Sequence, residues 1–316
     1  MEENLTLILC LYAAGLALSA LLYAYRLGRA GEKRLCALFG IILGLPLAYA
    51  GAKLSFLLKH MGMDIGGWSA ETFFSAAWEE LSFAGGCLGF TLGVWAAAKI
   101  LRVPGGKALD LFAVPGCILI AFARMAEAGM ANIGQGNLPA FLPEVFPIAV
   151  ADDWGASLAV FTPEALAALV CAAWLFFTGR KRTDGFSGQF RKAAVVLCSV
   201  QLFMEMLVTN YWIPFIISFI HLDQVLCGVI LLVAAIRGSV RNKKAEPAVA
   251  TVLLIGQNAL MQFVQDKPYL FSLPESMDVG ALAIAVFALC SAGLIAAGLW
   301  AQGKCQSSQE TSSKGS

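Results

Sequence analysis

Long apolar runs alternate with short polar segments along the whole chain. Each run is about 20 residues long, the length that an α-helix needs to cross the hydrocarbon core of a bilayer. The pattern predicts an all-α, polytopic membrane helix bundle. The eighth run is short and carries Gln257, Asn258 and Gln262, so it is predicted either as a span or as a re-entrant or interfacial helix. About nine spans are predicted, at residues 5–25, 36–58, 81–101, 108–128, 156–178, 193–213, 217–236, 248–264 and 279–302.

Composition supports this fold class. Apolar residues make up 59% of the 316-residue chain and charged residues 14%, against about a quarter charged in soluble domains. A soluble protein of this length could not bury so much apolar surface, whereas a bilayer is itself an apolar solvent. Glu2 and Glu3 stand where a cleavable signal peptide has positive charges, so the first run is predicted to remain as a span. The net charge of +1 gives no reason to expect a nucleic-acid partner.

The distribution of Lys and Arg predicts the orientation in the membrane. With nine spans, the loops on one side hold nearly all basic residues, whereas the opposite loops hold mainly Asp and Glu with Lys59 and Lys267. Because basic loops remain in the cytoplasm, the N-terminus is predicted outside and the C-terminus inside. Two outer loops, 59–80 and 129–155, are long. The second is predicted either as an ordered, non-helical lid or as a plain connector.

Cysteine and glycine spacing bears on metal chemistry and on helix packing. The nine cysteines are scattered singly, without a CxxC pair or a Cys/His cluster, so we expect buried thiols and no metal site. We also expect no cofactor, since no P-loop or dinucleotide fingerprint is present. Gly85, Gly89 and Gly93 recur every four residues, as do Gly40 and Gly44, a spacing that lets helix backbones approach closely in lipid.

Ionisable side chains inside the predicted spans are costly in hydrocarbon and mark candidate sites. Arg124 and Glu127 share a helix face, so they form either an ion pair or an anion site in which the guanidinium binds a phosphate. Gln201 and Glu205 share a face of the sixth span. His221, at a span end, is either a solvated surface group or a base. The other charged residues in or near the spans include Lys53, Glu164 and Asp223.

Several segments together resemble the prolipoprotein diacylglyceryl transferase family. The resemblance covers about residues 8–237, and Tyr12 falls where the family has a tyrosine in its first span. The segment 121–136, AFARMAEAGMANIGQG, is similar to a family motif that begins with glycine and arginine. The other matching segments are GAKLSFLL (51–58), WEELSFAGGCLG (78–89), ALDLFAVPG (108–116), QLFME (201–205) and LDQVL (222–226).

The resemblance implies an enzyme of the bacterial cytoplasmic membrane. Such enzymes move the diacylglyceryl group of phosphatidylglycerol onto the lipobox cysteine thiol of a lipoprotein precursor and release glycerol phosphate. The resemblance also implies that Arg124 contacts the lipid phosphate, that Gly85 and Gly86 line the site, and that Lys53 stands in for a family arginine. Tyr12 and Gln201 complete the implied substrate-binding set.

The chain also departs from the family pattern. Ala84 replaces the motif histidine, Gln201 replaces a motif arginine, and Glu127 replaces a motif asparagine. A thiol attacks as thiolate, so a base has to accept its proton. Glu127, Glu205 and His221 are the candidate substitutes for the missing base. If none of them acts, the chain is a catalytically lapsed member that binds phospholipid.

These observations predict three parts of the chain and rank the functions. Residues 1–237 form a seven-span, transferase-like core, 238–302 add about two C-terminal spans, and 303–316 form a polar, disordered cytoplasmic tail. The transferase is the leading hypothesis and the lipid-binding protein the alternative. A transporter is less favoured, because the two halves show neither an internal repeat nor matching broken helices.

Overall fold

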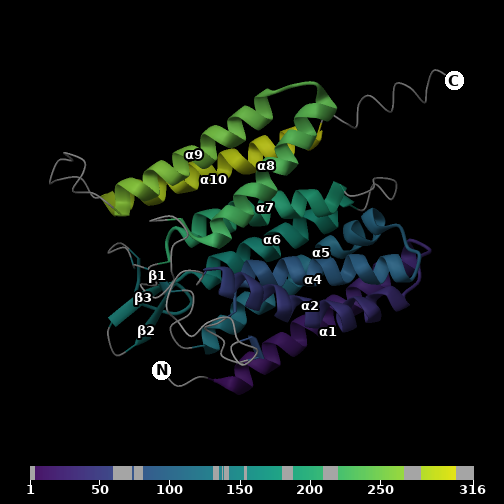
Figure 1. Cartoon of the computed structure of the whole chain (residues 1–316). Helices are drawn as coiled ribbons and strands as arrows, with labels where there is room; N and C mark the ends of the chain where they lie inside the picture. Colours follow the sequence, from purple (N-terminus) through teal and green to yellow (C-terminus); the bar gives the residue numbers. More distant parts are fainter. Residues whose placement is uncertain are drawn as a thin grey trace.

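The chain forms a bundle of long helices with a small β-sheet at one end (Figure 1). The computed structural model describes residues 4–59, 73–74, 81–130, 135–136, 138, 142–152, 155–179, 188–208, 220–266 and 279–303. The α-helices in these ranges are α1 (Leu5–Arg29), α2 (Leu35–Lys59), α4 (Phe83–Ile100), α5 (Gly105–Ala126), α6 (Phe161–Gly179), α7 (Gly188–Glu205), α8 (Leu222–Asn242), α9 (Glu246–Asp266) and α10 (Val279–Gly303).

Eight of these helices are long and apolar enough to cross a membrane, which confirms a multi-pass helical membrane protein. The remaining helix, α7, carries Arg191 and Lys192 in its first turns and Glu205 at its last residue, so its apolar stretch is short. It nevertheless lies among the others in the bundle (Figure 1). The eighth predicted run forms α9, a continuous helix of 21 residues that is one of the eight candidate spans.

Three predicted span boundaries were wrong. The fifth span does not begin at 156, because residues 155–159 form a strand and α6 begins at Phe161. Apolar content alone cannot separate a short buried strand from a helical turn. The sixth span does not reach 213 as one helix, because α7 ends at Glu205 and a turn follows. The seventh is displaced, since α8 begins at Leu222 and continues to Asn242.

The predicted outer loop 129–155 contains ordered, non-helical structure, as one of its two interpretations required. Strands β1 (Gln135–Gly136), β2 (Ala149–Asp152) and β3 (Gly155–Ala159) form an antiparallel sheet in the order β1-β3-β2. Leu158 of β3 and Val160 pack with Met204 near the end of α7. The sheet therefore lies over one end of the bundle, which we call the sheet end. Of the predicted tail 303–316, Gly303 is the last residue of α10, and the rest lies outside the described residues, as does most of the loop 59–80.

Helix direction alternates, so the basic residues gather at the opposite end, which we call the basic end (Figure 1). Lys33 donates to the Leu101 carbonyl across 3.1 Å, and Lys107 pairs with Glu32 at 2.7 Å. These contacts join the α1–α2 and α4–α5 turns. The two ends differ in charge as the sequence predicted, while the assignment of the basic end to the cytoplasm stays a prediction.

The spacing of glycines on α2 and α4 predicts close packing, and the structure confirms it. A Cβ on Gly89 would stand 2.0 Å from the Leu47 carbonyl oxygen, and one on Gly93 would stand 2.5 Å from the Gly44 Cα. Without side chains, the two backbones approach to direct contact, which compensates in lipid for the missing hydrophobic driving force. Gly86 differs, because its Cβ would meet Ala52 at an ordinary 3.7 Å.

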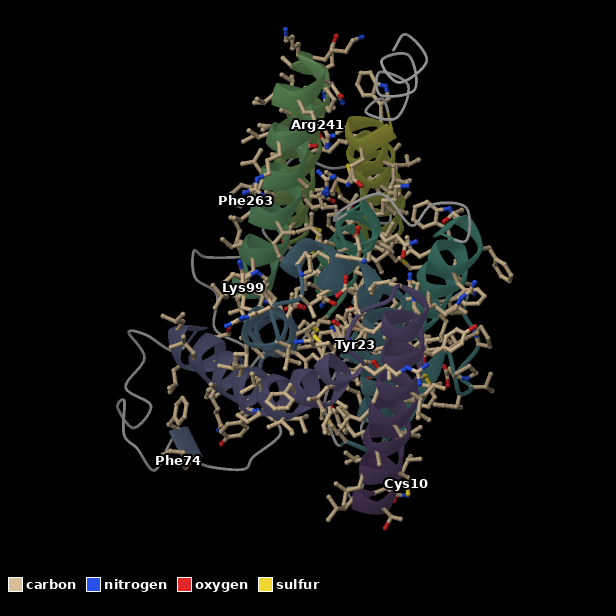
Figure 2. All side chains as sticks on the ribbon, turned by 90° about the vertical axis from the view of Figure 1, so that its right-hand side faces the viewer. Cys10, Tyr23, Phe74, Lys99, Arg241 and Phe263 are labelled. Carbon is tan, nitrogen blue, oxygen red and sulfur yellow. The ribbon has the colours of Figure 1, made fainter. Side chains whose placement is uncertain are left out.

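The C-terminal helices pack onto the rest through an apolar cluster. Val195 and Leu202 of α7 meet Leu231 of α8, Met261 of α9 and Phe287 of α10. In the view along the bundle, α8, α9 and α10 lie on the side opposite α1 (Figure 2). The same view shows Cys10 pointing outward from α1, away from the other helices.

Candidate functional site

A buried ion-pair network joins several helices near the sheet end, and Arg124 is its centre. Arg124 Nη1 donates to Glu127 Oε1 at 2.5 Å, and Nε lies 2.5 Å from Glu164 Oε2. Nη2 donates to Gln201 Oε1 at 2.8 Å. The ring of Phe83 covers the guanidinium, with 3.6 Å from Cζ to the ring centroid. Arg124 is 7% exposed, so its charge is compensated by protein groups and not by bulk water.

The network continues from α7 to the start of α8. Gln201 Nε2 donates to Glu205 Oε2 at 3.3 Å, as their shared helix face predicted. Glu205 Oε1 lies 3.0 Å from Nδ1 of His221. His221 is 2% exposed, so its interpretation as a solvated surface group was wrong. A carboxylate on one ring nitrogen fixes the orientation and tautomer of the imidazole, the arrangement that general bases use.

Two further glutamines extend the network to α9. The His221 backbone N–H donates to Gln224 Oε1 at 2.9 Å, and Gln224 Nε2 donates to Gln262 Oε1 at 3.0 Å. Next to them, Ser82 Oγ donates to Asp223 Oδ1 at 2.8 Å. Gln262 lies in α9, beyond the predicted core, so one of the added C-terminal helices contacts the network directly.

Acidic groups outnumber basic groups in this network. Glu127, Glu164 and Glu205 are each at least 93% buried. Arg124 pairs with Glu127 and Glu164, whereas Glu205 contacts Gln201 and His221. Glu205 also lies within electrostatic range of Glu127 and Glu164. Buried charges of one sign require donors or counter-charges close by. The site is therefore suited to a ligand that brings hydrogen-bond donors or positive charge.

The resemblance also assigned Tyr12, Gly85, Gly86 and Lys53 to substrate binding. Tyr12 lies within electrostatic range of Arg124 and Glu127 and packs with Ile8. Gly85 packs against the Gly51 carbonyl, where a Cβ would approach to 2.4 Å, so helix packing already accounts for this glycine.

Lys53 is fully buried on α2, and its Nζ lies 5.9 Å from the centroid of Phe56. Gly86 is partly exposed beside Ala52. Lipid contacts for Lys53, Tyr12, Gly85 and Gly86 stay predictions.

Of the two alternatives for Arg124 and Glu127, the ion pair is present, and anion binding by Arg124 stays a prediction. Glu164 also pairs with Arg124, but sequence reasoning did not assign it to the site. The sequence showed only that a carboxylate inside a span is costly to bury. Gln224 and Gln262 were also missed as members. Neutral amides in a span carry little signal, and only the fold brings α9 beside α8.

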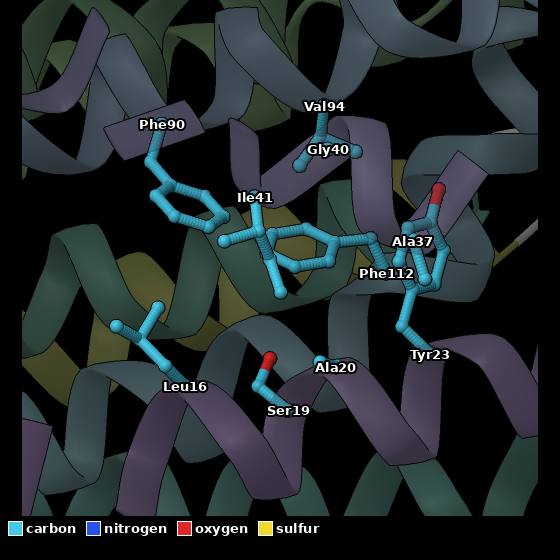
Figure 3. A pocket seen from close by; sticks show the side chains of 10 residues that line it. All are labelled: Leu16, Ser19, Ala20, Tyr23, Ala37, Gly40, Ile41, Phe90, Val94 and Phe112. Carbon is cyan, nitrogen blue, oxygen red and sulfur yellow. The ribbon is translucent and has the colours of Figure 1, made fainter. Parts of the chain in front are cut away.

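An apolar crevice lies elsewhere in the bundle, between α1, α2, α4 and α5 (Figure 3). Its two polar side chains are satisfied by α5, since Ser19 donates to the Pro115 carbonyl at 2.9 Å and Tyr23 to the Ala108 carbonyl at 3.2 Å. Phe112 on its wall is 12 residues from Arg124 on α5, which is about 18 Å along a helix. The crevice is thus separate from the polar network.

Comparisons with known proteins leave the family open. No protein-family model matches the chain, and neither the curated proteins nor the solved structures include a match. The class that the fold defines is therefore a multi-pass helical membrane protein with a buried, carboxylate-rich network.

Proposed function

We propose that the protein is a membrane transferase that moves a diacylglyceryl group from phosphatidylglycerol to the cysteine thiol of a lipoprotein precursor. The observation that carries this proposal is the Glu205–His221 pair, joined through Gln201 to Arg124. It combines a candidate base with a cation in one buried network. Arg124 stands at a position that the resemblance matches, whereas the Glu205–His221 pair would substitute for the motif histidine that Ala84 replaces. The proposal includes a bacterial cytoplasmic membrane, with the sheet end outside.

In the proposed reaction, the thiol sulfur forms a bond to the glyceryl carbon and the bond from that carbon to the phosphate oxygen breaks. The thiol proton passes to His221, and glycerol phosphate leaves. Glu205, 3.0 Å from Nδ1, stabilises the imidazolium that forms. His221 thereby takes the part of the family histidine that Ala84 replaces.

In this proposal Arg124 binds the phosphate through N–H groups that are not already bonded to protein acceptors. A guanidinium has five N–H donors. Arg124 Nη1 donates to Glu127 and Nη2 donates to Gln201, while Nε pairs with Glu164 by charge but makes no hydrogen bond among the described residues. One donor on each terminal nitrogen remains in the described part of the site. Two such donors form the fork that binds a phosphate bidentately.

The test is release of glycerol phosphate from phosphatidylglycerol by the purified protein in the presence of a lipobox peptide. A peptide with serine in place of the cysteine is the control for the thiol, and His221→Asn is the control for the base. Release that requires the thiol and falls about 10²–10⁴-fold in His221→Asn supports the transferase. Absence of release from a folded protein in phosphatidylglycerol vesicles overturns it.

A second candidate is a phospholipid-binding protein without turnover. It is favoured by the pairing of Arg124 with both Glu127 and Glu164 at 2.5 Å, since a guanidinium held between two carboxylates is a weak electrostatic catalyst for a phosphate leaving group. Under this alternative, lipid co-purifies with the protein at a fixed ratio and no glycerol phosphate appears. Measuring both quantities on one preparation separates the two functions.

A further inference from the structure

Three cations at the basic end lie close to aromatic rings, in contacts that the polar network near Arg124 does not involve. A ring attracts a cation within about 6 Å of its centroid through its quadrupole. The pairs are Arg29 with Tyr25 on α1 (6.0 Å from cation to centroid), Lys99 with Trp95 on α4 (5.4 Å), and Lys192 of α7 with Trp174 of α6 (5.9 Å). We call these six residues the cation–aromatic belt.

The three rings of the belt stand at a common depth. Helices α1, α4 and α6 all run toward the basic end (Figure 1). Tyr25, Trp95 and Trp174 stand four or five residues before the last residue of their helices. At 1.5 Å per residue, this places each ring about 6–8 Å from the end of its helix. The rings therefore define one level across three helices.

The exposed side chains next to the belt change in a fixed order along these helices. About one turn deeper in the bundle than each ring stands an exposed aliphatic side chain, in turn Leu21, Leu92 and Val170. Toward the basic end, aliphatic side chains are thus followed by aromatic rings and then by cations. A bilayer presents hydrocarbon, then the boundary where Trp and Tyr are enriched, then charged headgroups. The order places the belt at the headgroup boundary of one leaflet.

The belt is open to its surroundings. Tyr25 is 55% exposed and Trp95 is 44% exposed. The position of Trp95 is fixed by Gly105 at the start of α5, where a Cβ would come within 3.0 Å of the indole Nε1. Figure 2, in which the basic end faces the viewer, shows Lys99 at the edge of the bundle. A headgroup therefore has access to this cation without any opening of the helices.

The cations of the belt also lack a protein counter-charge in the part of the chain that the structure describes. Lys107, at the same end, forms an ion pair with Glu32 at 2.7 Å. No described carboxylate pairs in this way with Arg29, Lys99 or Lys192. Exposed cations at the membrane surface attract anionic lipids, and the neighbouring ring keeps each cation close to the helix surface.

We propose that the cation–aromatic belt binds the phosphate groups of anionic phospholipids in the leaflet next to the basic end. Each cation donates to a phosphate oxygen, and its ring lies deeper, beside the glycerol part of the lipid. A zwitterionic headgroup binds more weakly, because its own ammonium compensates the phosphate. The belt lies at the opposite end of the bundle from Arg124, so this binding does not depend on the proposed transferase reaction.

The experiment uses phosphatidylserine as the anionic probe, because phosphatidylglycerol is the donor of the proposed reaction. The purified full chain is mixed with equal amounts of phosphatidylserine and phosphatidylcholine of identical chains, and bound lipid is counted by native mass spectrometry. We expect phosphatidylserine to exceed phosphatidylcholine about fivefold, the ratio that one surface cation provides. Equal binding of the two lipids to the unaltered protein overturns the proposal.

Two triple variants separate the belt from the general positive charge of this end. One removes the belt cations, and the other removes three exposed cations at the end of α8, for which the described residues show no aromatic partner. They are Arg29→Gln, Lys99→Gln, Lys192→Gln and, as the matched control, Arg241→Gln, Lys243→Gln, Lys244→Gln. We expect the first to lower the ratio to about twofold or less and the second to keep most of it. Equal losses in the two variants overturn the proposal.

A variant without a change of charge tests the rings. Trp95→Leu keeps every cation, and we expect it to lose part of the preference for phosphatidylserine. If the first triple variant does not fold, Lys99→Gln against Lys243→Gln makes the same comparison with one exposed charge each. Release of glycerol phosphate from phosphatidylglycerol is unchanged in the folded belt variants of an active transferase, so failure of either proposal is seen separately.

Discussion

His221 Nδ1 lies 3.0 Å from Glu205 Oε1, in a part of the bundle where both residues are at least 93% buried. Glu205 is the last residue of α7, and His221 immediately precedes α8. Their contact therefore depends on how α7 and α8 pack. It turns two polar residues at span ends into a buried acid–base pair.

The first prediction concerns this pair. Glu205→Gln keeps the size of the side chain but removes the charge that orients and stabilises a protonated His221. We expect phosphate-ester release in the presence of a thiol peptide to fall about 10²-fold or more, with lipid binding retained. Unchanged release in a folded Glu205→Gln and in a folded His221→Asn would exclude the pair as the base.

A second prediction concerns the stability contributed by Arg124. Arg124→Ala leaves Glu127 and Glu164 buried without their cation, and breaking a buried pair in this way costs about 3–5 kcal/mol. We expect a large drop in the thermal unfolding midpoint in detergent. The combined Arg124→Met, Glu127→Gln, Glu164→Gln variant should recover much of the loss, because no uncompensated charge remains. A single variant as stable as the parent would show that Arg124 is not the electrostatic centre.

A third prediction tests the α2–α4 contact. A Cβ on Gly89 would stand 2.0 Å from the Leu47 carbonyl oxygen, so Gly89→Ala has to push the two backbones apart. We expect this variant to express poorly or to unfold at a clearly lower temperature. Gly86→Ala is the matched control, because its Cβ would meet Ala52 at 3.7 Å and should be tolerated. Equal behaviour of the two variants would contradict the packing described here.

A fourth prediction concerns Asp110, which anchors the start of α7. Its carboxylate accepts from the backbone N–H groups of Gly188 at 2.8 Å and Phe190 at 2.9 Å. These donors are otherwise unsatisfied at a helix N-terminus, and the helix dipole favours a negative charge there. Asp110→Ala should lower the free energy of unfolding by about 1–3 kcal/mol, measured by thermal unfolding. Asp110→Asn, which can still accept one bond, should lose less.

A fifth prediction tests whether the C-terminal helices support the site. Gln262 of α9 accepts from Gln224, whose own oxygen accepts from the His221 backbone. Gln262→Leu removes that acceptor at similar size, so we expect lower release of phosphate ester with little change in lipid binding. Gln257→Leu, on an exposed position of the same helix, is the control. Similar activity in both variants would limit α9 to a packing role.

The sequence alone determined the fold class and the positions of most helices. Runs of apolar residues decide which segments enter lipid, and this depends on local composition, so α1, α2, α4 and α5 begin and end close to their predicted bounds. The glycine spacing on α4 likewise predicted close packing, because glycines that recur along one helix face can be recognised from the sequence of that helix alone. The strand at 155–159 was missed although its partner β2 directly precedes it in the chain. A short apolar run does not by itself distinguish a strand from the start of a span.

The members of the site divide in the same way. Arg124, Glu127 and Glu205 could be marked from the sequence, because a charge inside a span is costly wherever the span lies. The tertiary structure alone decided that Glu164 pairs with Arg124, that Glu205 meets His221, and that Gln262 joins the network. These contacts connect different helices. The apolar composition of each helix places it in the membrane but does not specify which other helix it packs against.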